Sequence, residues 1–146
     1  MIVKKLFPDE KLIVTEYFDV HQDWEIPIPG FFIIAARRKI PSIGEFTEEE
    51  AREFIELLCT LRKGMRQVLN IEKVYLFQRE DTSHERFHLW VMPRHEWMEK
   101  FGKRVESIRP IIDHAEKNMV NENNLKEVRS AAKKMREFMK NNFAKV

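Results

Sequence analysis

Two of the five histidines in the sequence, His84 and His88, lie four residues apart with Glu85 between them. On a helix, this His-Glu-x-x-His spacing would place both imidazoles on one face, where they could bind zinc while the glutamate acts as a base. A third ligand would have to come from further along the chain, for example from Glu106 or Glu116. This interpretation predicts a zinc-dependent hydrolase.

The same stretch can also form a strand, because residues 87–92 are apolar or aromatic apart from His88. Strand alternation would place Arg86, His88 and Trp90 on one face and their apolar neighbours on the other. Pro93 closes the segment five residues after His88, too early for a zinc-binding helix. The composition therefore favours the strand, with a cation, an imidazole and an indole on one face.

A strand face of this kind could bind a nucleoside phosphate, because a guanidinium pairs well with phosphate oxygens. Thr82 and Ser83 precede the strand and would add hydroxyl donors. A histidine on a buried strand is also commonly a satisfied core residue. Spacing alone leaves both alternatives for His88 open.

The whole chain has 146 residues, of which 43% are hydrophobic and 34% charged, and its net charge is +2. We expect one soluble domain over residues 1–146, with no general charge signal for nucleic acid or a membrane surface. The single Cys59 excludes an intramolecular disulfide and fits a reducing cytoplasm. No apolar run approaches the roughly 20 residues of a membrane span, and the first ten residues do not resemble a signal peptide.

The elements that would position this face can be read from turn signals and periodicity. Thr47 and Glu50 form a capping box that begins a helix extending to about Leu69. Its apolar stripe consists of Phe54, Leu58, Leu61, Met65 and Val68. Strands are predicted over residues 11–18, 31–38, 73–79 and 86–92. The last two would form a hairpin, and residues 21–30, with two prolines and a glycine, would form a loop.

The segment beyond Pro93 has helical periodicity. Residues 105–119 keep an apolar stripe across Pro110, which is expected to kink the helix or begin its second half. Asn124 is the predicted cap of a last helix, whose stripe consists of Val128, Ala132, Met135 and Met139. Residues 124–146 hold seven basic and two acidic side chains. Without interleaved aromatic residues, these charges indicate the solvated face of a docked helix rather than a nucleic-acid site.

Several of these features in order resemble the histidine triad superfamily. They are the Pro29-Gly30 turn, the apolar run 31–40, the capped leucine-rich helix, and the segment Phe-His-Leu-Trp-Val-Met-Pro-Arg at 87–94. The resemblance covers roughly residues 10–98 and implies an α+β fold with an antiparallel sheet of about five strands and the 47–69 helix packed on it. Residues 99–146 would add two helices that the family core lacks. It also implies a homodimer, for which the stripe of the 47–69 helix could supply an interface or could simply be core.

In that family, the middle histidine of a His-x-His-x-His strand attacks the α-phosphate of a nucleotide. When the family's Pro-Arg pair is aligned, Arg86, His88 and Trp90 occupy the three triad positions. Phe31 and Lys39 stand where the family commonly has two further histidines. Only the nucleophile position, His88, therefore matches.

The resemblance implies a nucleotidyl hydrolase or transferase that acts on a diadenosine polyphosphate or nucleoside-phosphate-type substrate. His88 would form a covalent nucleotidyl-histidine, and neither a metal nor a cofactor is required. The expected substrate-binding residues are Arg86, Trp90, Gln78, Thr82, Ser83 and Asp23. Asp23 falls near the acid that holds the ribose hydroxyls in the family, but it could equally be a turn residue. The alternative is a catalytically inactive nucleotide-binding module, in which Trp90 and Phe31 fill the phosphate end of the pocket.

Overall fold

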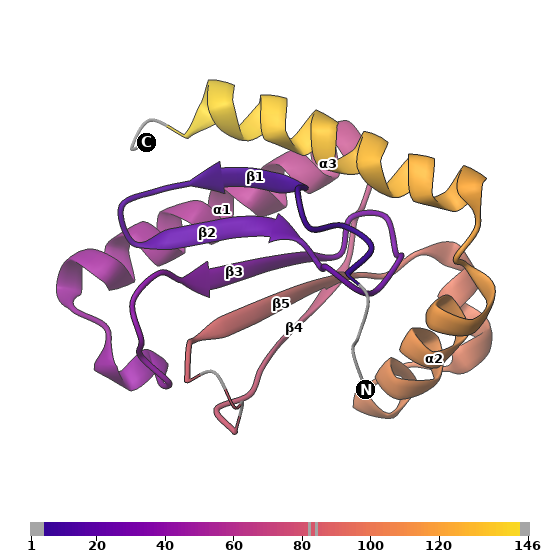
Figure 1. The fold of residues 1–146 in the computed structure, drawn as a ribbon, viewed down its shortest axis with the longest axis horizontal. Helices are drawn as coiled ribbons and strands as arrows, with labels where there is room; N and C mark the ends of the chain where they lie inside the picture. Colours follow the sequence, from indigo (N-terminus) through magenta and orange to yellow (C-terminus); the bar gives the residue numbers. More distant parts are fainter. Residues whose placement is uncertain (1–4, 82, 84, 144–146) are drawn as a thin grey trace.

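The computed structural model describes residues 5–81, 83 and 85–143. Within these residues, five strands form one antiparallel sheet in the order β1-β2-β3-β5-β4 (Figure 1). The strands are β1 (Lys11–Val14), β2 (Phe18–Gln22), β3 (Phe32–Ala36), β4 (Val74–Gln78) and β5 (His88–Pro93). The predicted α+β fold is confirmed, and β1 and β4 form the two edges of the sheet.

In the described residues, three α-helices accompany the sheet. They are α1 (Glu48–Leu69), α2 (Ile108–Asn118) and α3 (Glu122–Asn142), with short 3-10 segments at 43–45, 96–101 and 105–107. Helices α1 and α3 pack against each other and share one core with the sheet, whereas α2 lies beside one end of the sheet (Figure 1). In the described part of the chain, no helix has the length and apolar character that a membrane span requires.

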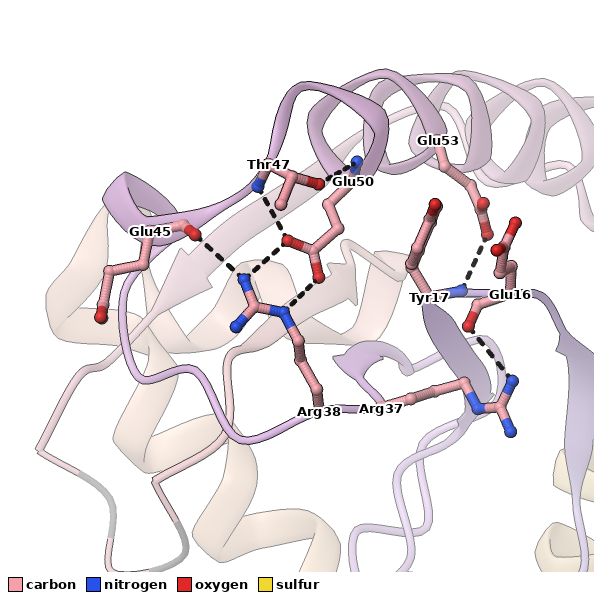
Figure 2. Close-up of polar contacts among 8 residues, drawn as sticks. All are labelled: Glu16, Tyr17, Arg37, Arg38, Glu45, Thr47, Glu50 and Glu53. Carbon is pink, nitrogen blue, oxygen red and sulfur yellow. Dashed lines mark hydrogen bonds and ion pairs between the residues drawn. The ribbon is translucent and has the colours of Figure 1, made fainter.

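Helix α1 begins at the predicted capping box, which also anchors the chain that leaves β3. Thr47 Oγ1 accepts a hydrogen bond from the Glu50 N–H, and Glu50 Oε1 accepts one from the Thr47 N–H at 2.8 Å. Figure 2 shows that the Glu50 carboxylate also accepts two hydrogen bonds from Arg38, at 2.7 and 2.8 Å. This pairing lowers the pKa of Glu50 to about 2. The ion pair therefore ties the end of β3 to the first turn of α1.

The larger core lies between the sheet and the two long helices. The predicted stripe residues Phe54, Leu61 and Met65 of α1 are buried in it. On α3, all four predicted stripe residues are buried. Gly64 lets the helices approach closely, because a Cβ at this position would lie 2.5 Å from the Phe138 ring. Of the two alternatives for the stripe of α1, a dimer interface or core, the structure shows core packing within the chain.

Residues 11–18 do not form one strand, as predicted, but two strands joined by a tight turn. The Thr15 hydroxyl accepts a hydrogen bond from the Phe18 N–H, and the backbone N–H of Thr15 donates to the Phe18 carbonyl. A threonine side chain that replaces a backbone partner in this way stabilises a turn. As a consequence, His21 and Gln22 belong to β2 rather than to the predicted loop over 21–30.

The C-terminal helices begin at other residues than predicted. Asn121 is the cap of α3, since its side chain accepts a hydrogen bond from the Asn124 N–H. The Asn124 amide instead donates to the Pro27 carbonyl at 2.7 Å and holds α3 to the loop after β2. Pro110 lies in the first turn of α2, where a backbone N–H has no helical partner to lose. It therefore lies at the beginning of the helix and does not kink it.

Candidate functional site

The central stretch forms a strand, with the alternation that the sequence predicts. Leu89 and Val91 of β5 are buried in the core beneath α1, whereas Trp90 and Met92 pack on the opposite face of the sheet. His88 is the first residue of β5, and residues 85–87 have no helical structure. The helical His-Glu-x-x-His interpretation is therefore wrong, and its first histidine lies outside the described residues.

A cleft of about 340 Å³ lies over the face of the sheet that carries His88. Its floor is formed by side chains of three neighbouring strands, namely Ile33, Phe77, His88 and Trp90. One wall is the segment 23–26 that follows β2, and the other is the part of α2 from 109 to 116. The volume is typical of a small-molecule site. The C-terminal extension therefore contributes directly to this site.

The backbone fixes the tautomer of His88. Its Nδ1 lies 2.8 Å from the carbonyl oxygen of Arg86. Because a carbonyl can only accept, Nδ1 carries the proton, and Nε2 of the neutral ring keeps its lone pair. The cross-strand neighbour of His88 on β3 is Ala35, whose methyl group leaves room beside the imidazole. The ring of Trp90, two residues further along β5, stacks on the His88 imidazole, with the ring centroids 5.9 Å apart. This arrangement suits an imidazole that acts as a nucleophile.

Trp90 is held in place on two sides. Its ring stacks on Phe77, with centroids 5.4 Å apart and planes 11° from parallel. Its indole N–H points to the carboxyl group of Asp23. The indole is half-buried and lines the cleft beside His88. It thus forms an aromatic surface where the family pattern has a third histidine.

Asp23 is the turn residue that the sequence left open as one alternative, and it also lines the cleft. Its Oδ1 accepts hydrogen bonds from the backbone N–H groups of Glu25 and Ile26, at 2.9 and 3.0 Å, and so forms a turn. The residue is 6% exposed and also lines the cleft. Burial raises the pKa of the Asp23 carboxyl, and the two backbone donors and the Trp90 indole oppose this effect.

His21 lies in the same cleft, although its sequence position suggested only a loop. Its ring stacks on Trp24 at 4.8 Å, and its Nδ1 donates to the Gln22 carbonyl at 2.8 Å. Burial lowers the pKa of His21, so the ring is neutral near pH 7. The available signal was the alternation over 18–22, where Phe18 and Val20 are core residues and His21 takes the other face.

The structure does not bring all the predicted binding residues to the cleft. Arg86 is exposed and is not among the residues that line the cleft, although its carbonyl oxygen lies 2.8 Å from Nδ1 of His88. Gln78 pairs with Leu89 in the β4–β5 ladder, so its side chain lies on the opposite face from His88. The Gln78 amide donates to the Arg79 carbonyl at 2.8 Å. Ser83 is exposed in a turn and Thr82 lies outside the described residues.

The cations that do line the cleft are Arg79 and Arg109, which the sequence interpretation missed. Each lies near a carboxylate on its own segment, Asp81 at 3.0 Å and Asp113 at 3.4 Å. Arg109, Ile112 and Glu116 line the cleft together because positions i, i+3 and i+7 share one face of a helix. That spacing was visible in the sequence, but the position of α2 relative to the sheet was not.

No protein-family profile and no curated protein matches the sequence, whereas solved structures do resemble this fold. The Plasmodium falciparum diadenosine triphosphate hydrolase, in complex with cyclomarin A, is 15% identical with a TM-score of 0.59, over 92% of this chain and 79% of that one. A Zn-bound histidine triad family protein from Mycobacterium smegmatis is 12% identical with a TM-score of 0.57, over 89% and 88%.

The Caenorhabditis elegans NitFhit protein is 12% identical with a TM-score of 0.54, over 73% of this chain. The chain spans only 26% of the length of NitFhit. These likenesses agree with the sequence resemblance centred on His88. The chain therefore has the fold of the histidine triad proteins.

Proposed function

We propose that the chain binds a nucleotide in the cleft above β5 and that His88 hydrolyses or transfers its nucleotidyl group. One observation carries this proposal: Nδ1 of His88 donates to the Arg86 carbonyl, so that Nε2 is the unprotonated nitrogen of the neutral imidazole, and His88 lines a cleft of small-molecule size. The likeness to a diadenosine triphosphate hydrolase supports a diadenosine polyphosphate or nucleoside-phosphate-type substrate.

The reaction would proceed in two displacements. First, Nε2 of His88 forms a bond to the α-phosphorus while the P–O bond to the leaving group breaks. Then the oxygen of water, or of another acceptor, forms a bond to the same phosphorus, the N–P bond breaks, and the imidazole is regenerated. Water gives hydrolysis and another acceptor gives transfer. Neither step requires a metal or a cofactor.

Charge on the phosphate oxygens has to be stabilised during both steps. We assign this role first to Arg79, which lines the cleft, and in second place to Arg86, which lies one residue before the core position Phe87 at the entry to β5. Gln78 faces the α1 side, so Arg79 replaces it in this proposal. Ser83 and Thr82 remain proposed hydroxyl donors on the loop before β5. Asp23, at the cleft wall, is proposed to bind the ribose hydroxyls.

A catalytically inactive nucleotide-binding module is the second candidate. It is favoured by Trp90, whose ring stacks on Phe77 and whose indole is directed at Asp23. An indole supplies one donor and no proton acceptor, so it cannot replace a histidine in proton transfer. Phe31 is fully buried beneath the cleft and adds no polar group.

The test is to incubate the purified chain with diadenosine polyphosphates, nucleoside phosphoramidates and nucleotide sugars, and to measure released mononucleotide. We expect release with at least one substrate class, a loss of about 10³-fold or more in His88→Ala, and unchanged release in His114→Ala, outside the cleft. Mass spectrometry of a rapidly quenched reaction should show a nucleotidyl adduct on His88. Tight nucleotide binding without turnover of any substrate would leave the binding module.

The remaining expectations are also proposals. We propose a homodimer formed through the edge of β4, because Leu76 on this strand is 49% exposed and an open strand edge pairs readily with a second copy. Measuring the mass of the protein in solution tests this. We also propose one functional unit over residues 1–146, with a core at about 10–98, in a reducing cytoplasm that suits the exposed Cys59.

A further inference from the structure

A second cleft, of about 440 Å³, lies where α1 ends and β4 begins. It shares no lining residue with the cleft that contains His88. Its basic side chains are Arg62, Arg66, Lys73, Arg94 and Lys103. Two acidic side chains, Glu72 and Glu99, also line it, so the charge of the lining is +3. We call this site the basic cleft.

Two of the five cations are held rigidly by the fold. The Arg62 guanidinium donates to the backbone carbonyls of Ile71 and Glu72, at 3.4 and 3.0 Å. The Arg94 guanidinium lies 4.5 Å from the centroid of the Tyr75 ring and donates to the Gly102 carbonyl at 2.9 Å. Neither arrangement involves a carboxylate, so both side chains are positioned without being neutralised.

The other three cations, Arg66, Lys73 and Lys103, are exposed. In the part of the chain that the structure describes, none of the five cations forms an ion pair, although seven ion pairs occur elsewhere in it. Burial, together with the charge of Arg66, lowers the pKa of Arg62. Like charges are thus held together at a cost that a bound anion would remove.

The end of α1 explains only part of this cluster. A cation in the last turn of a helix is favoured by the helix dipole, which accounts for Arg66. Lys73 precedes β4, however, and Arg94 and Lys103 flank the 3-10 segment 96–101. Three separate segments therefore contribute cations to the basic cleft, and the dipole of α1 does not account for this arrangement.

We propose that the basic cleft binds a di- or triphosphate group. The lining charge of +3 matches such a chain better than a single phosphate, which carries about −1.5 to −2 near pH 7. The guanidiniums offer paired donors to phosphate oxygens, and the exposed lysines supply adaptable point charges. A nucleic-acid strand is disfavoured because stacking needs an open aromatic ring, and Arg94 covers Tyr75.

The test measures binding of inorganic tripolyphosphate by titration calorimetry at low ionic strength. The variant is R66Q/K73Q/K103Q, which leaves Arg62 and Arg94 in place; the matched control K133Q/K134Q/K140Q removes the same charge from exposed positions on α3. We expect the first triple variant to weaken binding about tenfold or more, and the control to change it less than about twofold. Both should keep the wild-type circular dichroism spectrum and melting temperature.

Further arms separate this site from the His88 cleft and from other anions. R66Q/K73Q/K103Q should weaken tripolyphosphate binding by the same factor in the His88→Ala and R79Q/R109Q backgrounds as in the wild type, whatever the outcome for turnover. The charge-preserving R66K/K73R/K103R should retain binding. The loss of affinity caused by R66Q/K73Q/K103Q should be about as large for ATP as for tripolyphosphate, and small for AMP.

Three results would overturn the proposal. The first is that tripolyphosphate does not bind. The second is that both triple glutamine variants weaken binding equally, because binding would then depend only on the total charge. The third is binding of a single-stranded RNA oligonucleotide with which tripolyphosphate does not compete, since this would indicate a nucleic-acid surface.

Discussion

The two faces of the sheet are built from the same strands but differ in how they are covered. On one face, α1 and α3 enclose the larger core, which is formed by side chains of the sheet and of both helices. On the other, α2 and the 3-10 segment 96–101 cover one end only, around a smaller cluster. The uncovered part holds His88, Trp90 and the cleft. A closed face thus supports the fold, and an open face of the same strands is available for chemistry.

The largest expected effect contrasts one buried aliphatic side chain from each face. Leu61 of α1 is 0% exposed within the closed core, whereas Ile33 of β3 is 6% exposed and lines the cleft. Leu61→Ala should lower the free energy of unfolding by about 4 kcal/mol, because the cavity it leaves is enclosed. Ile33→Ala should cost only about 2 kcal/mol, because its cavity opens into a cleft that water can enter. Urea denaturation of both variants measures the difference.

Equal costs for the two variants would contradict the distinction between a closed and an open face. Ile33→Val is a suitable control, since it removes one methyl group from the floor of the cleft. It should cost about 1 kcal/mol. Unchanged denaturant slopes would show that the variants alter stability rather than the unfolded state.

The next effect tests how the closed face is attached. The pKa of Glu50 in the folded chain is about 2, against 4.5 for the ordinary side chain, because Arg38 binds its carboxylate. A depressed pKa contributes stability that is complete above about pH 4.5 and is lost as the pH falls toward 2. The contribution amounts to about 3 kcal/mol at most. Glu50→Gln should therefore be less stable than the wild type at pH 6, and the gap should close near pH 2.

The matched control for Glu50 is Glu48→Gln, two residues earlier on the same helix. Glu48 pairs with Arg52 at 2.8 Å, but its side chain is 75% exposed. Water and salt screen such a pair, so its loss should change stability by less than about 0.5 kcal/mol at any pH. A difference between Glu50→Gln and wild type that stays constant with pH would mean that the Glu50 charge does not stabilise the fold.

The closed face could be predicted from the sequence, and particular residues show why. The capping box at Thr47 and the stripes of α1 and α3 obey local rules, since periodicity and cap chemistry act within a few residues. The alternation in β5 was predicted in the same way. The turn at Thr15 was missed because a hydroxyl replaced the glycine or proline that usually marks a turn.

The open face was predicted less well because it is assembled from distant segments. His88, Trp90 and Asp23 were identified, and the structure brings them into one cleft. His21 was missed because its strand was assigned to a loop, and Arg109 because α2 reaches the sheet only through tertiary packing. Arg86 was expected at the site from strand alternation, but it lies before β5 begins. Local sequence patterns therefore predict which side chains share a face of the sheet, whereas tertiary contacts decide which other segments line the cleft above that face.

A further small change in stability is expected at Asp23, where the turn can be separated from the proposed binding of ribose. In Asp23→Asn, the amide oxygen can still accept the hydrogen bonds from the Glu25 and Ile26 N–H groups, so the turn should persist. Burial raises the pKa of Asp23 above 3.8, so its ionisation weakens the fold as the pH rises through that region. Thermal unfolding at pH 7 should therefore show Asp23→Asn to be as stable as the wild type or slightly more stable, by less than about 1 kcal/mol.

Asp23→Ala, in contrast, loses the turn and should be less stable by about 1 kcal/mol or more. If the carboxylate also binds ribose hydroxyls, Asp23→Asn should weaken nucleotide binding by about tenfold, because an amide replaces a charged acceptor. Unchanged affinity in Asp23→Asn would leave Asp23 with the turn alone. If Asp23→Asn loses as much stability at pH 7 as Asp23→Ala does, then the charge of Asp23, and not the geometry of its hydrogen bonds, holds this wall of the open face in place.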